Sequence, residues 1–145
     1  MESEAHLAAA YVQFYEALKP ETLGDLSSVV HDDIFFKDPF NEVRGVQAYA
    51  AILTHMFNVA PDIEFKVAHC AYAEEICFLR WESRATVKAL GKEPWVVQGM
   101  SELTFAPDGR VLTHVDHWDA AAQFYERLPI LGSVLWLIRR RAAVG

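Results

Sequence analysis

The chain has 145 residues, of which 52% are hydrophobic, 12% aromatic and 23% charged, so it belongs with globular proteins and not with disordered chains. Its formal net charge of −7 disfavours nucleic acid binding, which needs a clustered basic surface. No apolar run reaches the roughly 18 residues of a membrane span, and the acidic N-terminus lacks the basic start of a signal peptide. We therefore expect a cytoplasmic protein without a membrane span.

The absence of repeats and linker-like stretches predicts a single domain over residues 1–145, with residues 120–145 as a helical C-terminal tail. Cys70 and Cys77 are too few for a disulfide framework or a four-ligand zinc site. The basic run from Arg139 to Arg141 is typical of a solvated helix end, and a phosphate or membrane contact is the less favoured alternative.

The first 60 residues carry helical patterns around one short strand. Apolar residues at helical spacing predict a helix from Glu4 to Leu18, a short helix at residues 23–30 and a third after Gly45 that ends near Asn58. Between them, "DDIFFKDPF" predicts a strand that ends at a proline, with Ile34, Phe36 and Asp38 on one face.

From residue 63 the apolar period changes to two. The segments "IEFKVAHCAY", "ICFLRWESRATV", "WVVQGMSELTF" and "VLTHVDHWD" are separated by short turns, which predicts an antiparallel meander of four strands. In the first segment the alternation places Ile63, Phe65, Val67 and His69 on one face. Helices beside one-sided strands predict an α+β fold, a curved antiparallel sheet wrapped around the N-terminal helices.

The last strand holds an unusual number of titratable groups. Leu112, His114, Asp116 and Trp118 share one face, and residues 111, 113, 115 and 117 share the other. Both faces mix polar and apolar residues, so alternation alone leaves the choice of inner face open. On the preceding strand, Ser101 belongs to the more apolar face.

The segments "FFKDPFNEVRG" and "GRVLTHVDHWD" resemble the cone-shaped α+β superfamily named for nuclear transport factor two, a cystatin-like fold. That superfamily includes ketosteroid isomerase, the SnoaL polyketide cyclases, scytalone dehydratase and limonene epoxide hydrolase. The resemblance covers about Leu7 to Pro129 and is greatest to SnoaL-like members, which share "DPF", a later "RG", "D-x-W-D" and "LP-x-x-G". It implies a pocket for a small apolar molecule, and by analogy a homodimer.

The resemblance also implies roles for particular residues. The general base of the isomerase is an aspartate before proline, a position that Asp38 takes here; the alternative is that Asp38 only forms a turn. Counted from "F-x-x-x-G-R", the pocket positions of the last strand fall on His114, Asp116 and Trp118. The isomerase's protonated carboxylic acid falls on Ser101, a weaker donor, and its helical tyrosine falls on Tyr15 or Tyr11.

The epoxide hydrolase offers another comparison, because "RWE" with Asp116 looks similar to its arginine and aspartate set. Alternation, however, points Arg80 and Glu82 away from the pocket. The aromatic residues Trp118, Trp81, Phe36 and Phe57 are expected either in the core or as walls of a ligand site. A metal site from His69, His114 and Asp116 can be drawn, but nothing in the spacing demands it, so we expect no metal and no cofactor.

We therefore expect an enzyme that binds a small, mostly apolar carbonyl or polyene compound and moves a proton, as an isomerase, a cyclase or a dehydratase does. Asp38 would be the base, His114 and Asp116 a proton relay or oxyanion partner, and Tyr15 or Ser101 a hydrogen-bond donor. The second hypothesis is a binding module that uses the same pocket without turnover. The third is an interaction domain whose exposed sheet face makes a homodimer.

Overall fold

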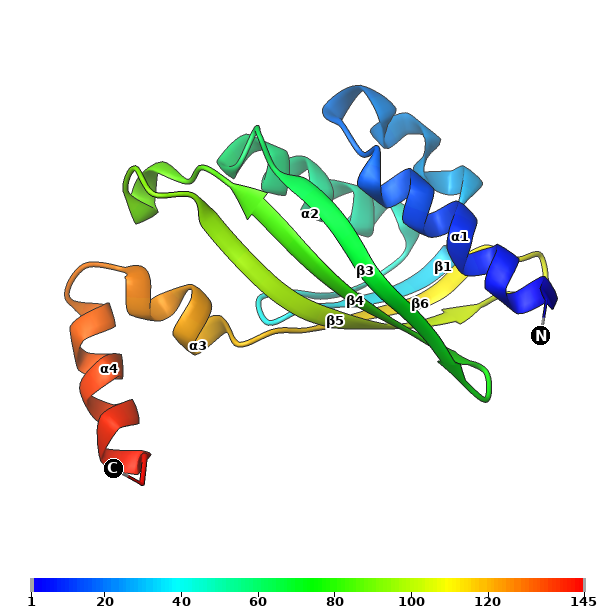
Figure 1. Ribbon diagram of the computed structural model, residues 1–145. Coiled ribbons are helices and arrows are strands. Elements are labelled where there is room, and N and C mark those ends of the chain that lie inside the picture. The colour runs from blue at the N-terminus through cyan, green and yellow to red at the C-terminus, as the bar shows by residue number, and fades with distance from the viewer. Residues whose placement is uncertain (1, 145) are drawn as a thin grey trace.

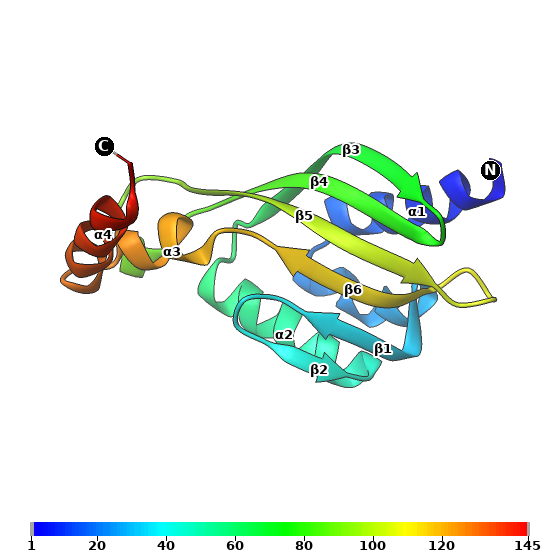
Figure 2. The ribbon, with the colours of Figure 1, turned by 90° about the horizontal axis from the view of Figure 1, so that it is seen from below.

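The chain forms a curved, unclosed sheet of six strands with helices packed on one of its faces (Figures 1 and 2). The computed structural model describes residues 2–144, with side chains from His6 onward. The strands lie in the order β2-β1-β6-β5-β4-β3. Their bounds are β1 (Val30–Lys37), β2 (Glu42–Arg44), β3 (Glu64–Ala73), β4 (Ile76–Ala85), β5 (Trp95–Phe105) and β6 (Val111–His117).

Two long helices cover the inner face of the sheet. They are α1 (Glu2–Glu16) and α2 (Val46–Val59), and both lie on the same side of the strands in Figures 1 and 2. The shorter helices are η1 (Pro20–Ser28), η2 (Lys88–Leu90), α3 (Ala120–Gln123), η3 (Tyr125–Arg127) and α4 (Leu131–Ala142). Within residues 2–144, no helix is long and apolar enough to cross a membrane.

The α+β fold predicted from the sequence is confirmed. Strands β3 to β6 pair in succession as an antiparallel meander, and β5 has the bounds of the segment "WVVQGMSELTF". The sequence did not predict β2, whose three residues are too short to show a period, or the parallel pairing of β1 with β6. That parallel pairing sets Phe36 beside His114 and so joins the first strand to the last.

One predicted strand face is wrong beyond Val67. The pairing of β3 with β4 shifts register between Val67 and His69, so that His69 lies opposite the exposed Arg80. A bulge of one residue moves every later side chain to the other face. His69 is therefore exposed on the outer face and lies apart from His114 and Asp116, whereas Tyr72 is partly buried.

The core lies between the helices and the inner face of the sheet. Its fully buried side chains come from α1, η1, α2 and all the long strands except β3. The largest of them are Tyr11, Tyr49, Leu26, Ile34, Leu53, Leu103, Val30 and Val111. Two of these are tyrosines, whose hydroxyls need hydrogen-bond partners at such depth.

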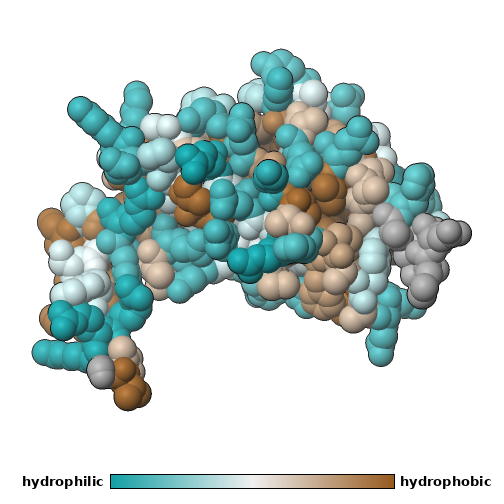
Figure 3. Space-filling model, viewed as in Figure 1, coloured by the Kyte–Doolittle hydropathy of each residue, from teal (hydrophilic) through white to brown (hydrophobic). Residues whose placement is uncertain are grey.

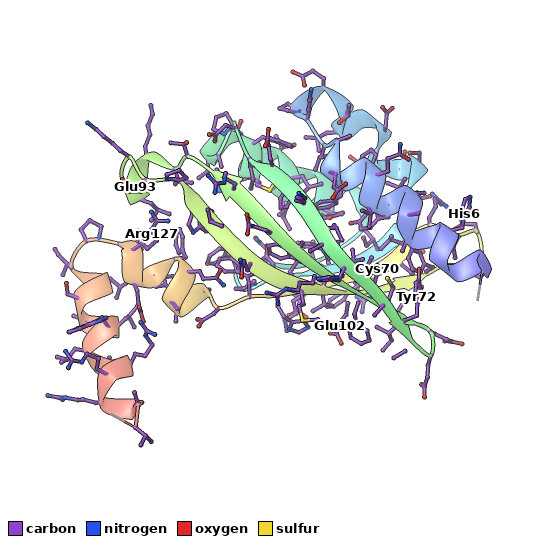
Figure 4. The ribbon with its side chains drawn as sticks, in the orientation of Figure 1. His6, Cys70, Tyr72, Glu93, Glu102 and Arg127 are labelled. Atoms are coloured by element: carbon purple, nitrogen blue, oxygen red, sulfur yellow. The ribbon has the colours of Figure 1, made fainter. Side chains whose placement is uncertain are left out.

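The segment after β6 is fastened to the start of β5. Nε1 of Trp95 donates to the backbone oxygen of Gln123 at 2.7 Å, and the side chain of Gln123 bonds the backbone of Gln98 in both directions. Nη1 of Arg127 donates to the backbone oxygen of Pro94 at 3.4 Å, close to the turn that carries Glu93 (Figure 4). Helix α4 follows these contacts and projects away from the sheet (Figure 1).

Candidate functional site

The site is assembled by the pairing of β5 with β6. Their register sets Ser101 opposite Asp116 and Leu103 opposite His114. Because directly opposite residues point to the same face of a sheet, Ser101, Asp116 and His114 all point inward, toward α1 and α2. The inner face of β6 is thus the one that carries His114, Asp116 and Trp118.

Asp116 collects hydrogen bonds from two strands. The Ser101 hydroxyl donates to Oδ1 of Asp116 in a short hydrogen bond, and Nε2 of His114 lies 2.7 Å from the same oxygen. Nε1 of Trp81 donates to the Ser101 hydroxyl at 2.8 Å, which fixes the rotamer of the serine. The side chain of His114 is 4% exposed and that of Asp116 is 14% exposed, so the pair is largely shielded from water.

Three tyrosines continue the chain on the other side of the imidazole ring. The Tyr11 hydroxyl lies 2.7 Å from Nδ1 of His114 and 3.0 Å from the Tyr49 hydroxyl. The Tyr49 hydroxyl also lies 3.4 Å from Nδ1 and donates to the Tyr15 hydroxyl at 3.3 Å. An unbroken path of hydrogen bonds therefore runs from Asp116 through His114, Tyr11 and Tyr49 to Tyr15.

One arrangement of donors satisfies all the hydrogen bonds between Tyr15 and Asp116 at once. Each hydroxyl has one proton to give. Since Tyr49 donates to Tyr15, Tyr11 must donate to Tyr49, and Nδ1 of His114 must then donate to Tyr11. The contact between Nε2 and Asp116 needs a second proton. All these bonds form together when Nδ1 of His114 donates to Tyr11 and one further proton lies between Nε2 of His114 and Oδ1 of Asp116.

The three tyrosines stay protonated over the ordinary pH range. Burial raises the pKa of the Tyr11, Tyr15 and Tyr49 phenols above their usual value near 10. Tyr15 raises the pKa of Tyr11 further, whereas the hydrogen bond with Tyr49 lowers it by less than burial raises it. Tyr11 and Tyr15 both raise the pKa of Tyr49, and Asp116 raises that of Tyr15. The phenols therefore act as neutral hydrogen-bond donors and acceptors.

A cavity of about 570 Å³ opens beside one end of this chain of hydrogen bonds. Its walls come from β1, α2, β4, β5 and the segment after β6, and most of the side chains are apolar. They are Tyr15, Phe36, Asp38, Phe40, Asn41, Ile52, Leu53, His55, Met56, Val59, Ala60, Ile63, Phe65, Trp81, Ser83, Val87, Trp95, Val97, Asp116, Trp118, Phe124 and Tyr125. This volume lies within the range of sites that bind small molecules.

A second, much smaller cavity of about 30 Å³ adjoins the same polar groups. Tyr11, Ser101 and His114 line only this one, whereas Tyr15 and Asp116 line both cavities. The smaller space is about that of one water molecule. Tyr15 and Asp116 therefore form the boundary between the buried chain of hydrogen bonds and the large cavity.

Asp38 lies at the wall of the large cavity, directly after β1. Its Oδ1 accepts hydrogen bonds from the backbone N–H of Phe40 and Asn41, both at 2.7 Å, and from Nδ2 of Asn41 at 3.1 Å. Its Oδ2 is contacted only by Nδ2 of Asn41, at 3.2 Å, among the hydrogen bonds described. Asp38 thus forms the turn that the sequence allowed, and Oδ2 is the oxygen with spare acceptor capacity.

The remaining predicted residues fall into three positions. Phe36, Trp81 and Trp118 line the large cavity, and Phe57 is buried in the core outside its walls. Arg80 and Glu82 line neither cavity; Arg80 is exposed, and Glu82 accepts a hydrogen bond from Nε2 of Gln98. Over the described part of the chain, no three His, Cys, Asp or Glu side chains gather as they would around a metal ion.

Sequence reasoning missed Tyr49, the residue that joins Tyr11 to Tyr15. A signal was available, because Tyr49, Leu53 and Phe57 follow at intervals of four on the predicted helix and all three are buried. A tyrosine within such a buried stripe needs a partner for its hydroxyl. The sequence also posed Tyr11 and Tyr15 as alternatives, whereas both belong to the same chain of hydrogen bonds.

The fold is that of NTF2-like proteins. An NTF2-like protein of unknown function from Exiguobacterium sp. 255-15 superimposes with a TM-score of 0.67 at 19% identity, over 78% of this chain and 98% of that one. A SnoaL-like polyketide cyclase from Agrobacterium tumefaciens gives 0.66 at 16% identity, over 82% and 93%. An LEH-like epoxide hydrolase from M. tuberculosis gives 0.65 at 16% identity, over 94% and 97%. At these identities the likeness concerns the fold alone.

The sequence itself identifies the family. The model of the SnoaL-like domain matches residues 11–114, which is more than half of the chain. The protein therefore belongs to the SnoaL-like family, as its motifs suggested. The matched region begins at Tyr11 and ends at His114, so Asp116 and Trp118 lie just beyond it. No curated protein sequence matches the chain.

Proposed function

We propose that this protein binds a small, mostly apolar molecule in the 570 Å³ cavity and moves a proton on it without a cofactor, as an isomerase, a cyclase or a dehydratase does. One observation carries the proposal. The two ends of the hydrogen-bonded chain, Tyr15 and Asp116, line the cavity, and its middle is buried. A proton accepted at one end can be returned to the same ligand at the other.

The relay works by reversing the direction of the hydroxyl groups. When the His114–Asp116 pair gives up one proton, Nδ1 of His114 becomes an acceptor, so Tyr11 donates to it and Tyr49 donates to Tyr11. Each proton moves only along an existing hydrogen bond. Because burial keeps the three phenols neutral, the transfer passes along the chain without a lasting phenolate.

Asp38 is the base in this proposal, and its free acceptor capacity on Oδ2 supports that role. It would take a proton from a carbon next to a carbonyl group, while Tyr15 or Asp116 donates a hydrogen bond or a proton to the carbonyl oxygen. Two carboxyl groups in one apolar cavity disfavour an anionic ligand. The ring-rich walls favour a flat, unsaturated one.

A second candidate is binding without turnover. It is favoured by the hydrogen bonds that hold Oδ1 of Asp38 in its turn, since a carboxylate used for structure is a poorer base. The similarity of fold to a polyketide cyclase supports the catalytic candidate. An epoxide hydrolase mechanism has less support, because Arg80 and Glu82 line neither cavity.

Solvent deuterium exchange tests the proposal. The protein is incubated in D₂O with 1-tetralone, a flat apolar ketone, and loss of the proton signals beside the carbonyl is followed by NMR. We expect exchange faster than in buffer, abolished by Asp38→Asn and by Asp116→Asn and retained by Glu102→Gln, which alters an exposed carboxylate. Binding without exchange would favour the second candidate. Neither binding nor exchange over a panel of apolar ketones, lactones and epoxides would overturn both.

A further inference from the structure

Helix α4 leaves most of its apolar side chains in contact with solvent. Seven of the ten exposed large hydrophobic side chains of the described chain lie between residues 130 and 144. Val134, Leu137 and Ile138, which are 51%, 48% and 58% exposed, follow at i, i+3 and i+4 and form one stripe, here called the α4 stripe. Ile130, which is 84% exposed, directly precedes the helix. Figure 3 shows apolar surface interspersed with polar groups on this projecting part of the molecule.

The opposite side of α4 is the side that is fastened to its own chain. Nε of Arg139 lies 2.6 Å from Oε1 of Glu126, and Gly132 is buried against the backbone of Glu126. These contacts with η3 orient the helix and lie on the side opposite the α4 stripe, and the helix itself projects away from the sheet (Figure 1). An exposed apolar stripe of this kind is typical of a surface that contacts another molecule.

The backbone between η3 and α4 is strained. Ile130 has φ 66° and ψ −64°, and the N–H of Leu131 donates to the oxygen of Pro129 at 2.7 Å, which closes a three-residue turn. This turn is rare, and a positive φ is a marked outlier for a β-branched residue. The projecting pose of α4 therefore costs free energy within one molecule, which contacts outside that molecule can offset.

The net charge of α4 is opposite in sign to that of the rest of the chain. Residues 131–145 hold three arginines and no acid, whereas residues 1–130 hold ten lysines and arginines against 20 aspartates and glutamates, a formal charge of −10. A basic helix is therefore attracted to the acidic body of another copy of this chain. The same acidic body is repelled by an anionic membrane, which makes a second copy the better partner.

We propose that α4 docks on a second copy of this chain, where the α4 stripe covers the mouth of the partner's cavity, and that the two copies exchange their α4 helices reciprocally. The mouth offers a receiving surface of matching character. Phe40 and Val59, 47% and 48% exposed, both line the cavity. Among the side chains that the structure describes, these two and Met100 are the exposed large hydrophobic ones outside residues 130–144. Asp38 adds a carboxyl group to the wall of the same cavity.

The size of the contact favours exchange in both directions. A helix of 12 residues is about 18 Å long, too short for one copy of it to bury the roughly 800 Å² per partner of a stable interface. A two-fold arrangement doubles the contact, because each copy donates one helix and receives another. The cavity of each copy is then closed by a helix of its partner.

Sedimentation velocity at micromolar concentration tests the proposal without any ligand, so its result is independent of the proposed function. We expect a dimer for the full chain and a monomer for Leu137→Glu, with unchanged circular dichroism. Met100→Glu is the matched control: Met100 is 43% exposed, but on β5, so we expect that variant to stay dimeric. A dimer lost in Met100→Glu and kept in Leu137→Glu would instead place the interface on the sheet and overturn the proposal.

The receiving surface is tested by mixing two variants that each carry one introduced cysteine in a Cys70→Ser background, in which Cys77 stays buried. A disulfide between Leu137→Cys of one copy and Val59→Cys of the other is the expected result under mild oxidation. A dimer without this cross-link would mean that α4 docks elsewhere, and a monomeric full chain would mean that it does not dock on a second copy; either overturns the proposal. Flotation of a monomeric full chain with phosphatidylserine vesicles, lost in Leu137→Glu, would identify a membrane as the partner instead.

Discussion

Nε2 of His114 lies 2.7 Å from Oδ1 of Asp116, with the two side chains 4% and 14% exposed. A hydrogen bond between groups that can carry charge is strong when it is shielded from water, and the loss of one partner leaves the other unsatisfied. Asp116 also accepts the Ser101 hydroxyl, so the carboxylate holds two strands together through side chains as well as backbone.

Asp116→Asn is therefore expected to lower the free energy of unfolding by about 1.5 to 3 kcal/mol, measured by urea denaturation at pH 7. Glu102→Gln is the control, because Glu102 faces Nε2 of His117 at the same 2.7 Å but with side chains 41% and 60% exposed (Figure 4). Exposed pairs contribute little, so we expect a loss of about 0.5 kcal/mol or less in the control. Equal losses in the two variants would contradict the shielding argument.

The buried tyrosines make the fold sensitive to alkali. Burial raises the pKa of Tyr11, Tyr15 and Tyr49, so above pH 10 the unfolded chain releases phenolic protons that the folded chain keeps. Stability from these groups is complete below pH 10 and falls as the pH rises further. Each such tyrosine contributes a slope of about 1.4 kcal/mol per pH unit.

Tyr49→Phe should make the fall of the unfolding free energy with pH less steep by about 1.4 kcal/mol per pH unit, the contribution of one such tyrosine. Urea denaturation at a series of pH values from 9 to 11.5 measures it. The Cys77 thiol, whose pKa burial raises to about 12, adds the same contribution to both proteins and cancels in the comparison. Identical slopes for the two proteins would contradict the assignment of Tyr49 to the buried chain.

Gly99 leaves room for the indole of Trp81. A Cβ atom at position 99 would lie 2.5 Å from Cζ2 of Trp81 and 3.0 Å from the backbone oxygen of His117. Gly99→Ala is expected to cost about 1 to 3 kcal/mol of stability and to weaken the hydrogen bond from Trp81 to Ser101. Urea denaturation and tryptophan fluorescence measure the two effects. Gly24→Ala is the control, since no atom lies within 4 Å of its added Cβ; a similar loss there would point to a general effect of alanine.

The two cysteines should differ in reactivity although their sulfur atoms lie only 3.4 Å apart. Cys70 is exposed on β3 (Figure 4), whereas Cys77 is fully buried with a pKa raised to about 12. Thiolate is the reactive form, so iodoacetamide at pH 8 should alkylate Cys70 rapidly and Cys77 only on unfolding. Mass spectrometry of timed digests counts the modified sites. Rapid modification of Cys77 in the folded protein would show that the end of the β3–β4 hairpin opens.

The fold was predictable because the spacing of the apolar residues indicates the same helix or strand as the residue composition over long segments. The alternation in β4 and β5 is regular, and its apolar faces are the buried ones. The prediction from alternation is wrong after Val67, where a bulge inserts one residue and so reverses the two faces of the strand. No feature of the local sequence indicates this bulge. The partner of β1 could not be predicted either, since a parallel pairing between segments as far apart in the sequence as Phe36 and His114 has no local signal.

Within the site, the resemblance to the superfamily supplied the inner face of β6, which alternation left open. The resemblance gave Tyr11 and Tyr15 as alternatives, whereas both belong to the site. The sequence could not show this, because the distances from their hydroxyls to the Tyr49 hydroxyl depend on how α1 packs against α2 and β6. The same packing decides that Tyr49 joins them. Phe57 follows Leu53 by four residues, which is slightly more than one helical turn. The two side chains therefore point in slightly different directions, with Leu53 at the cavity and Phe57 in the core.

The most direct test is whether a ligand bound in the large cavity changes the chemical shifts of the buried imidazole of His114. Long-range ¹H–¹⁵N NMR spectra of the histidine rings, recorded as 1-tetralone is added, report it. We expect the signals of both ring nitrogens of His114 to shift in proportion to the bound fraction, while those of His117, on the outer face, stay in place. Saturable binding of the ketone in the cavity with the His114 signals unmoved would contradict it.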